Sequence, residues 1–341
     1  MHIATAYLPY EVFASSDRGD LPLPRVFIAP QRYIQGRGVL KSIGRYLSLV
    51  KATRVALLMS ERGGQREGVT VRDAVRAAGM ACVDSIFKGE CSVEEITRHA
   101  EALAGHGIDC VIAAGGGKCI DTGKGVAFRL GVPVVIVPTL ASNDAPCSAL
   151  SVIYSPEGVT SPTLASAAIG EVCAQTLFRE GRAAAAAVAA STVNESLEAV
   201  VEANTLLSGL GFESGGVAAA HGVAQSYTAI PAVHANYLHG EMVAMGTLAQ
   251  LLLEARPDEA AKVAQFFATV GLPVHLGQLS LAAGDSRALD VLVEGTLAFP
   301  FIANMPQPVT APLVRSAILD AHRIGLSVSE RIGDAAYRRL H

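Results

Sequence analysis

Residues 110–122, which read CVIAAGGGKCIDT, are the most informative stretch of the 341-residue chain. Five apolar residues predict a buried strand, and three consecutive glycines then lead into a helical pattern. Glycines at such a turn let the backbone approach a pyrophosphate, and the first turn of the helix offers free N–H groups to it. The stretch matches neither the G-x-G-x-x-G fingerprint nor the Walker loop. From the glycines alone, a phosphate site and an ordinary tight turn are equally good interpretations.

Short apolar runs and amphipathic helical patterns alternate on both sides of this turn. Residues 55–59 and 134–137 predict two further strands, and residues 69–78 and 92–105 predict two helices. The second of these helices opens with a Ser-Val-Glu-Glu capping box. Because apolar strands alternate with amphipathic helices, we expect a parallel sheet that is covered on both faces.

Helical patterns dominate the chain after about residue 160. We therefore expect an N-terminal extension over 1–24, an α/β domain with a parallel sheet over 25–160, and an all-α domain over 161–341. The helices expected in the all-α part cover 163–178, 194–208, 216–226, 240–255, 257–270 and 312–324.

The composition excludes several classes of protein. Half of the residues are hydrophobic, 17% are charged and the net charge is −4, without a cluster of Lys and Arg, so we expect no nucleic-acid partner. The chain lacks both a signal-peptide pattern at its start and the roughly 18 unbroken apolar residues of a membrane helix. Six cysteines without a C-x-x-C pair predict reduced thiols. We expect a cytoplasmic enzyme.

A polar loop, residues 138–148 (PTLASNDAPCS), follows the strand predicted over 134–137. In an open parallel sheet, the loops after the strands line the ligand crevice. Thr139, Ser142, Asp144 and Ser148 would suit a cofactor or a polyol there. A solvated turn is the alternative interpretation.

Two histidines, His221 and His239, lie in helical patterns of the second half. Histidines on adjacent helices can supply two of the three protein ligands of a catalytic metal. A single histidine on an alanine-rich helix is more often a core residue, and His234 is a nearby residue of the same type that we do not expect to bind metal.

Together these segments resemble the glycerol dehydrogenase family, a branch of the iron-containing alcohol dehydrogenase and dehydroquinate synthase-like superfamily. The resemblance extends from about residue 25 to 325. The matching stretches are YIQG (33–36), GGGKCIDT (115–122), PTLASNDAPCSALSVIY (138–154), SPEG (155–158), EANTLLSGLGFESGGVAAAH (202–221), HGE (239–241) and NMP (304–306).

The resemblance implies a dehydroquinate synthase-like fold, in which residues 25–160 form the α/β dinucleotide-binding domain, residues 161–341 form the helical metal and substrate domain, and the active site lies between them. It also implies hydride transfer from a secondary alcohol of glycerol or a similar small polyol to NAD. It places Asp144 on a substrate hydroxyl, makes Asp144 and His221 catalytic, and gives His221 and His239 to zinc or another divalent metal. It also implies a symmetric homo-oligomer. The residues that it places against NAD are Gly115, Gly116, Gly117, Lys118, Asp121, Thr139, Ser142, Ser148, Leu150 and Tyr154.

The chain departs from the family after residue 158. The family's third metal ligand is an Asp in a Gly-x-Gly-Asp-Ala-Leu-like motif, and we expect it shortly after residues 155–158. Here the chain passes directly to a later helix, and no Asp occurs between Asp144 and Asp258. We infer an internal deletion of a few dozen residues. The carboxylates that would have to substitute are Glu195, Glu198, Glu213, Glu241 and, less plausibly because it lies far from the motif, Asp334.

Two alternatives therefore stay open. One is a catalytically impaired, nucleotide-binding member of the family that lacks a complete metal site. The other, ranked lowest because no Lys/Arg cluster lies near His221, is a glycerol-1-phosphate dehydrogenase or a dehydroquinate synthase-like cyclase. The choice between NAD and NADP is also open. Ser60 stands where the family usually has an Asp for the ribose 2′-hydroxyl, with Glu61 and Arg62 beside it.

Overall fold

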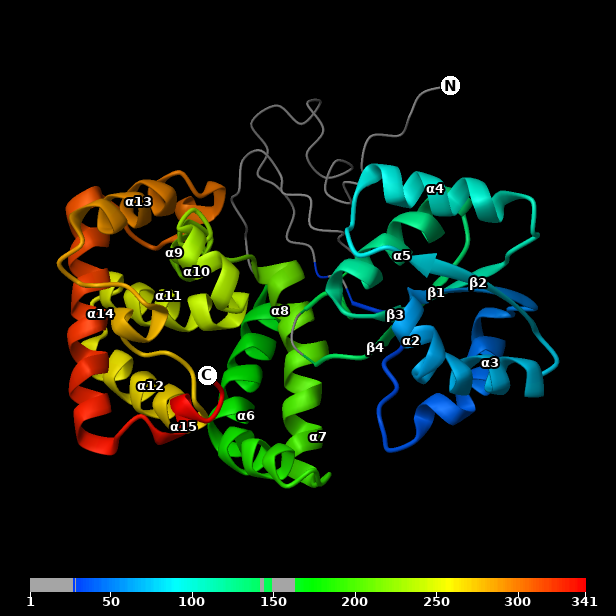
Figure 1. Ribbon diagram of the computed structural model, residues 1–341, viewed down its shortest axis with the longest axis horizontal. Helices are drawn as coiled ribbons and strands as arrows, with labels where there is room; N and C mark the ends of the chain where they lie inside the picture. Colours follow the sequence, from blue (N-terminus) through cyan, green and yellow to red (C-terminus); the bar gives the residue numbers. More distant parts are fainter. Residues whose placement is uncertain (1–26, 28, 142–143, 149–162) are drawn as a thin grey trace. The chain divides into compact units, whose positions relative to one another are not determined.

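The structure, a computed structural model, describes residues 27, 29–141, 144–148 and 163–341 (Figure 1). Three predicted cofactor residues, Ser142, Leu150 and Tyr154, lie outside these ranges. So do the N-terminal extension over 1–24 and the site of the expected deletion after residue 158. No helix in the described part of the chain is both long enough and apolar enough to cross a membrane.

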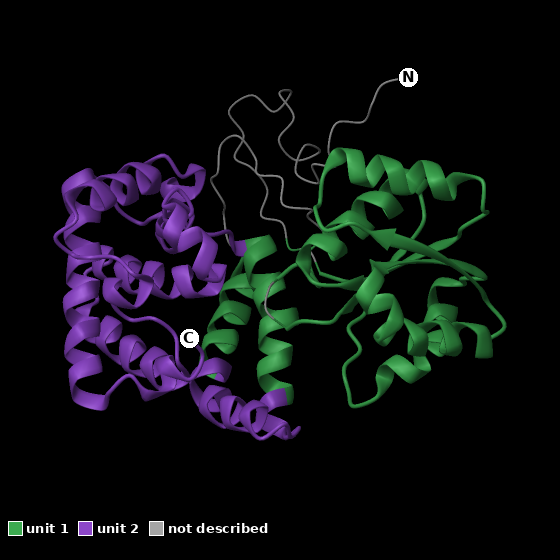
Figure 2. Cartoon of the chain, in the orientation of Figure 1, with its two compact units in different colours: residues 1–154, 162–175, 198–214 green, residues 155–161, 176–197, 215–341 purple. Residues whose placement is uncertain are grey.

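The chain divides into two compact units (Figure 2). Unit 1 consists of residues 1–154, 162–175 and 198–214, and unit 2 of residues 155–161, 176–197 and 215–341. Boundaries between the units fall within three helices, α6 (Leu164–Ala189), α7 (Glu195–Glu202) and α8 (Ser208–Gly215).

Unit 1 contains a four-stranded, all-parallel sheet, as expected from the alternation of strands and helices. Its spatial order is β2-β1-β3-β4, with Val55 of β1 opposite Cys110 of β3 and Val111 of β3 opposite Val134 of β4. The strands are β1 (Arg54–Ser60), β2 (Ala81–Phe87), β3 (Cys110–Gly115) and β4 (Val134–Pro138).

Helices cover both faces of this sheet (Figure 1). Val55, Leu57 and Met59 of β1 belong to the core shared with α1 and α3, whereas Ala56 and Leu58 belong to the core shared with α4 and α5. Burial of a side chain the size of leucine contributes about 1.5–3 kcal/mol. The helical segments of this half are η2 (Val39–Ser42), α1 (Ile43–Leu47), η3 (Ser48–Val50), α2 (Glu61–Gln65), α3 (Glu67–Ala77), α4 (Val93–Ala104) and α5 (Gly117–Leu130).

The start of α4 shows how the local sequence sets a helix boundary. Ser92 Oγ accepts a hydrogen bond from Glu95 N at 3.2 Å, as the predicted capping box requires. The Glu95 carboxylate, however, accepts from Lys88 N at 3.0 Å. The side chain of Glu95 therefore connects the start of the preceding loop, directly after β2, to the first turn of the helix.

The described residues of unit 2 form helices and connecting turns, without strands. Tyr227, Met245, Leu248, Leu276 and Leu292 are fully buried in its core. Of the expected helices, 257–270 has the predicted bounds, and the last extends eight residues beyond 324, to Ile332. After α7, the π-helix η4 (Ala203–Leu207) and all but the last residue of α8 (Ser208–Gly215) still belong to unit 1. The later helical segments of unit 2 are α9 (Ala219–Tyr227), α10 (Pro231–Asn236), α11 (His239–Leu253), α12 (Pro257–Val270), η5 (Leu276–Leu279), α13 (Ser286–Leu297), η6 (Pro300–Asn304), α14 (Ala311–Ile332) and α15 (Ala335–Arg338).

Candidate active site

The glycine turn connects β3 directly to α5. Thr139 N, just after β4, donates to Gly115 O at 3.0 Å and so ties the neighbouring loop to this turn. A side chain at residue 115 would collide with the helix, because an added Cβ would lie 2.7 Å from Cys119 Cβ. The close approach of the turn to α5 therefore requires a glycine at residue 115. Without side chains, the three glycines also leave the turn open to a ligand.

The N-terminus of α5 carries no side-chain cap. Gly116 is the N-cap residue, and no side chain accepts a hydrogen bond there. The first-turn N–H groups, which begin at Gly117, are thus oriented as a phosphate site needs. Lys118 lies in the same turn with a 64% exposed side chain, and its Nζ is 2.7 Å from Glu90 Oε1.

A buried lysine joins two of the predicted cofactor residues. Lys124 Nζ lies 3.1 Å from Asp121 Oδ1 and 3.2 Å from Ser148 Oγ. Burial raises the pKa of Asp121, and the ammonium of Lys124 opposes this shift. The sequence prediction missed Lys124, although its position three residues after Asp121 on a helix places the two on one face.

Hydrogen bonds and packing within unit 1 hold the loop after β4 in place. Asp144 O accepts from Cys147 N at 3.1 Å and from Ser148 N at 3.2 Å, and Asn204 donates to Ala141 O at 3.1 Å. Gly209 of α8 packs against this loop, since an added Cβ would lie 3.0 Å from Asp144 O. The Asp144 carboxylate contributes to the raised pKa of Asp121, so the structure brings these two predicted residues near each other.

The end of β1 offers no carboxylate at the position that the ribose would need. Ser60 Oγ accepts from Gly63 N at 3.2 Å and thereby caps α2. Glu61 and Arg62, in the first turn of that helix, are both exposed.

The two predicted metal ligands meet in unit 2. The rings of His221 in α9 and His239 in α11 lie 5.6 Å apart between centroids, at 47° to each other. Burial and the nearby His239 lower the pKa of His221 to about 4. A neutral imidazole is the form that binds a metal, so this environment favours ligation.

Close packing of α9 against α11 brings these histidines together. An added Cβ at Gly246 of α11 would lie 2.1 Å from Ala220 O of α9. One turn later, Gln250 Oε1 accepts from Ala220 N at 2.8 Å and satisfies an N–H in the first turn of α9. Asn304, part of a stretch matched to the family, donates to Val217 O at 2.8 Å just before α9.

The described residues do not complete a metal site. They contain no group of three His, Cys, Asp or Glu side chains that could hold a metal ion. Two of the carboxylates suggested as a replacement third ligand contact other groups. Glu241 accepts from Leu238 N at 2.6 Å and contacts His341, and Asp334 accepts from Gln278 at 3.1 Å. The two imidazoles suit a divalent metal, but a catalytic site ordinarily has three protein ligands.

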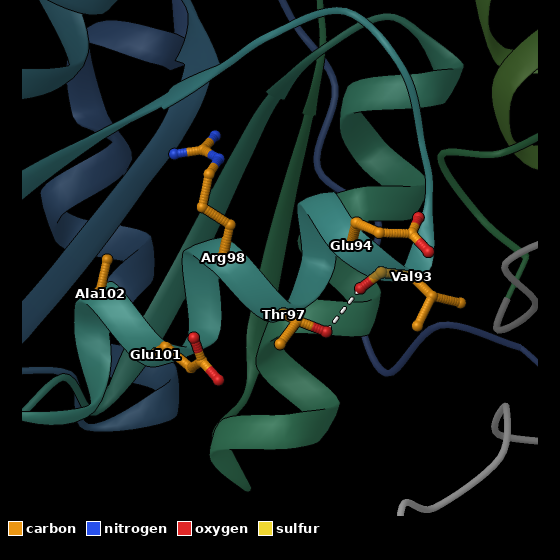
Figure 3. A pocket seen from close by; sticks show the side chains of 6 residues that line it. All are labelled: Val93, Glu94, Thr97, Arg98, Glu101 and Ala102. Carbon is orange, nitrogen blue, oxygen red and sulfur yellow. Dashed lines mark hydrogen bonds between the residues drawn. The ribbon is translucent and has the colours of Figure 1, made fainter.

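A shallow hollow on the outer side of α4 contains none of the predicted site residues (Figure 3). All of its lining side chains come from that one helix, and Thr97 Oγ1 donates to Val93 O at 2.6 Å. Nothing in this lining resembles a cofactor or metal site.

Comparisons with known proteins place the chain in a family. Residues 30–170 match the family model described as iron-containing alcohol dehydrogenase. A glycerol dehydrogenase of Escherichia coli is 35% identical over 89% of this chain and 98% of its own length. The chain belongs to the iron-containing alcohol dehydrogenase family, in its glycerol dehydrogenase branch. A glycerol dehydrogenase of Pseudomonas putida is 36% identical, with the same coverage of both chains.

Solved structures of this family confirm the predicted fold class. Glycerol dehydrogenase from Schizosaccharomyces pombe has a TM-score of 0.85 at 28% identity, covering 91% of this chain and 93% of that chain. A probable glycerol dehydrogenase from Sinorhizobium meliloti 1021 has a TM-score of 0.77 at 31% identity, covering 89% and 99%.

The alignment with the Escherichia coli relative is longer than this chain. It extends over 367 positions, whereas the whole chain has 341 residues. That glycerol dehydrogenase therefore carries residues that have no counterpart here, in agreement with the predicted internal deletion.

Proposed function

We propose that this chain oxidises a secondary alcohol of glycerol or a closely related small polyol, with NAD as the hydride acceptor. The observation that carries this proposal is its similarity to glycerol dehydrogenases at 35–36% identity over nearly their whole length. The open turn between β3 and α5 supports the same conclusion, because it has the glycines and the uncapped helix start that a dinucleotide needs.

We assign the pyrophosphate to the first turn of α5, where Gly116 and Gly117 are half-buried and no side chain caps the helix. Asp121, Thr139 and Ser148 would contact the rest of the dinucleotide, together with residues of the loop that lie outside the described ranges. The bound nicotinamide supplies the hydride acceptor, and the protein supplies its position. Asp144 would orient the substrate by accepting a hydrogen bond from one of its hydroxyl groups.

We assign His221 and His239 to a divalent metal, zinc or iron. Such an ion, when bound, would polarise the substrate alcohol and lower its pKa. The described residues supply two donors and not three, so we derive no catalytic step through the metal.

The incomplete donor set favours a second candidate function. A family member that kept the dinucleotide turn but lost a metal ligand would bind NADH without turning over an alcohol. The missing third donor in the described residues and the longer sequence of the relatives both favour this candidate.

One pair of measurements separates the two candidates. Metal content of the purified chain is measured by elemental analysis, and reduction of NAD or NADP is followed at 340 nm with glycerol and 1,2-propanediol, with and without added zinc or ferrous iron. About one equivalent of metal per chain and metal-dependent turnover support the dehydrogenase. Tight NADH binding without metal and without turnover under every condition supports the second candidate and overturns the first.

A further inference from the structure

Lys124 is a charged side chain in an unusually enclosed place. The residue is 9% exposed and lies in the middle of α5, on the side of the helix that packs in unit 1. Lysine is almost never this buried unless its ammonium is paired. Here the ammonium donates to Asp121 Oδ1 and to Ser148 Oγ. Because Lys124 is buried and has defined partners in two segments, it does more than keep the protein surface soluble.

The two partners come from different segments of unit 1, the helix α5 and the loop after β4. Asp121 is one turn earlier on α5, after β3, and Ser148 lies in the loop after β4. Both belong to the set proposed to contact the dinucleotide. Lys118 differs in kind, because its exposed ammonium pairs with Glu90 on the surface. Lys124, in contrast, donates from α5 to the Ser148 hydroxyl in the loop after β4, and both residues are buried.

The charges around Lys124 give it a second effect. Asp121 lies near the Asp144 carboxylate, which together with burial raises the pKa of Asp121, whereas Lys124 lowers it. Among the residues that the structure describes, the thiols of Cys91 and Cys147 also face this cluster, and burial raises the pKa of both, so they stay neutral. The ammonium of Lys124 therefore favours the ionised form of Asp121 beside a second carboxylate.

We propose that Lys124 is a positioning residue for the dinucleotide, which holds the Asp121 carboxylate and the Ser148 hydroxyl in place through its two hydrogen bonds. The proposal rests on the proposed dinucleotide site. It assigns to Lys124 no contact with NAD and no proton transfer. The affinity for the dinucleotide should depend on Lys124 through its two partners.

The test compares NADH binding by the wild-type chain, Lys124→Met and Lys124→Arg, by titrating nicotinamide fluorescence. Methionine keeps the length of the side chain and removes its charge and donors. We expect the dissociation constant of NADH to rise about tenfold or more in Lys124→Met, because two hydrogen bonds from a charged group are lost. Arginine should recover part of the affinity. If the enzyme turns over, the KM for NAD should rise while the KM for glycerol stays near its wild-type value.

A pH titration and a double-mutant cycle separate positioning from a merely structural role. Without the ammonium the pKa of Asp121 rises further, so NADH affinity of Lys124→Met should begin to fall at a higher pH than in the wild-type chain. Adding Asp121→Asn to Lys124→Met should weaken NADH binding by much less than Asp121→Asn does alone.

Lys262→Met, which removes an exposed lysine from α12 in unit 2, is the matched control and should bind NADH normally. The proposal is overturned if folded Lys124→Met binds NADH with wild-type affinity and pH dependence. Should Lys124→Met fail to fold, Ser148→Ala takes its place, and normal NADH binding by that variant overturns the proposal equally. A wild-type chain that binds no NADH would instead refute the dinucleotide site itself.

Discussion

At the scale of single residues, Gly123 sets how closely α5 approaches the sheet. A Cβ added there would lie 2.3 Å from Ala113 Cβ in β3, far inside any real contact. We expect Gly123→Ala to lower the free energy of unfolding by about 1–3 kcal/mol, because the helix must move away from the strand. Urea unfolding followed by circular dichroism measures this change.

Gly105→Ala is the matched control for that substitution. Gly105 caps the C-terminus of α4 at φ −84°, and an added Cβ there would meet nothing within 4 Å. The control should leave the stability unchanged or raise it slightly. Equal losses in both variants would contradict the packing argument.

The histidine pair gives a second prediction at this scale. We expect His239→Ala to lower metal affinity and alcohol oxidation about 100-fold or more, since it removes a ligand and not merely a supporting group. NADH binding should persist, because the glycine turn is untouched. Elemental analysis and the 340 nm assay measure the two effects.

His234→Ala serves as the control for His239→Ala. His234 is exposed in the last turn of α10, five residues before His239, and lies outside the proposed site. It should bind metal and turn over as the wild-type chain does. Normal metal content in His239→Ala would remove that residue from the proposed ligand set.

At the scale of elements, the crossing of α9 and α11 decides where His221 lies. Gly246 allows the contact with Ala220 O, immediately before His221. Gly246→Ala should therefore separate the helices, lower the free energy of unfolding by about 1–3 kcal/mol and weaken metal binding, while NADH affinity is retained. Thermal unfolding and metal titration measure both effects.

Gly170→Ala is the control at this scale, because Gly170 lies inside α6 and an added Cβ would meet nothing within 4 Å. The alanine should stabilise the helix by up to about 1 kcal/mol. Metal affinity that is unchanged in Gly246→Ala would show that the crossing does not position His221.

How far the sequence predicts these elements depends on which interactions form them. The strands over 54–60, 110–115 and 134–138 are apolar enough to be found from their own residues. The sequence did not predict the edge strand β2, because Asp84 and Ser85 interrupt its apolar pattern. Its extended conformation depends on pairing with β1. The roles of Lys124 and Gln250 were not predicted for a related reason. Their partners, Ser148 and Ala220, lie 24 and 30 residues away in the sequence.

At the scale of the whole molecule, a buried histidine should make stability depend on pH. His99 is fully buried, and its Nδ1 lies 2.6 Å from Ser85 Oγ, with Glu95, Arg98 and Lys88 as its charged neighbours. Burial, and then Arg98, lower the pKa of His99 below its ordinary value. The unfolded chain therefore binds the proton more readily, so the contribution of neutral His99 is present above about pH 6.5 and is lost below it.

We expect the urea midpoint of the wild-type chain to fall between about pH 7.5 and 5.5, and to fall less in His99→Gln. Glu95 does not titrate in this range, because Arg98 lowers its pKa to about 2. His275 and His322 also have lowered pKa values and act with the same sign, so the comparison uses the difference between the two proteins. An identical pH dependence in both would exclude His99 as a source.

The interleaving of the two units has a consequence for how the chain is made on the ribosome. The fourth strand of the sheet is complete at Pro138, yet unit 1 needs partners that are synthesised much later. Tyr33 hydroxyl meets Thr205 Oγ1 at 2.7 Å, and Gln35 donates to Glu198 O at 2.9 Å. A nascent chain thus carries all four strands while Tyr33 and Gln35 still lack their partners in η4 and α7, until about 70 more residues emerge. Such an incompletely packed unit is a typical substrate for chaperones.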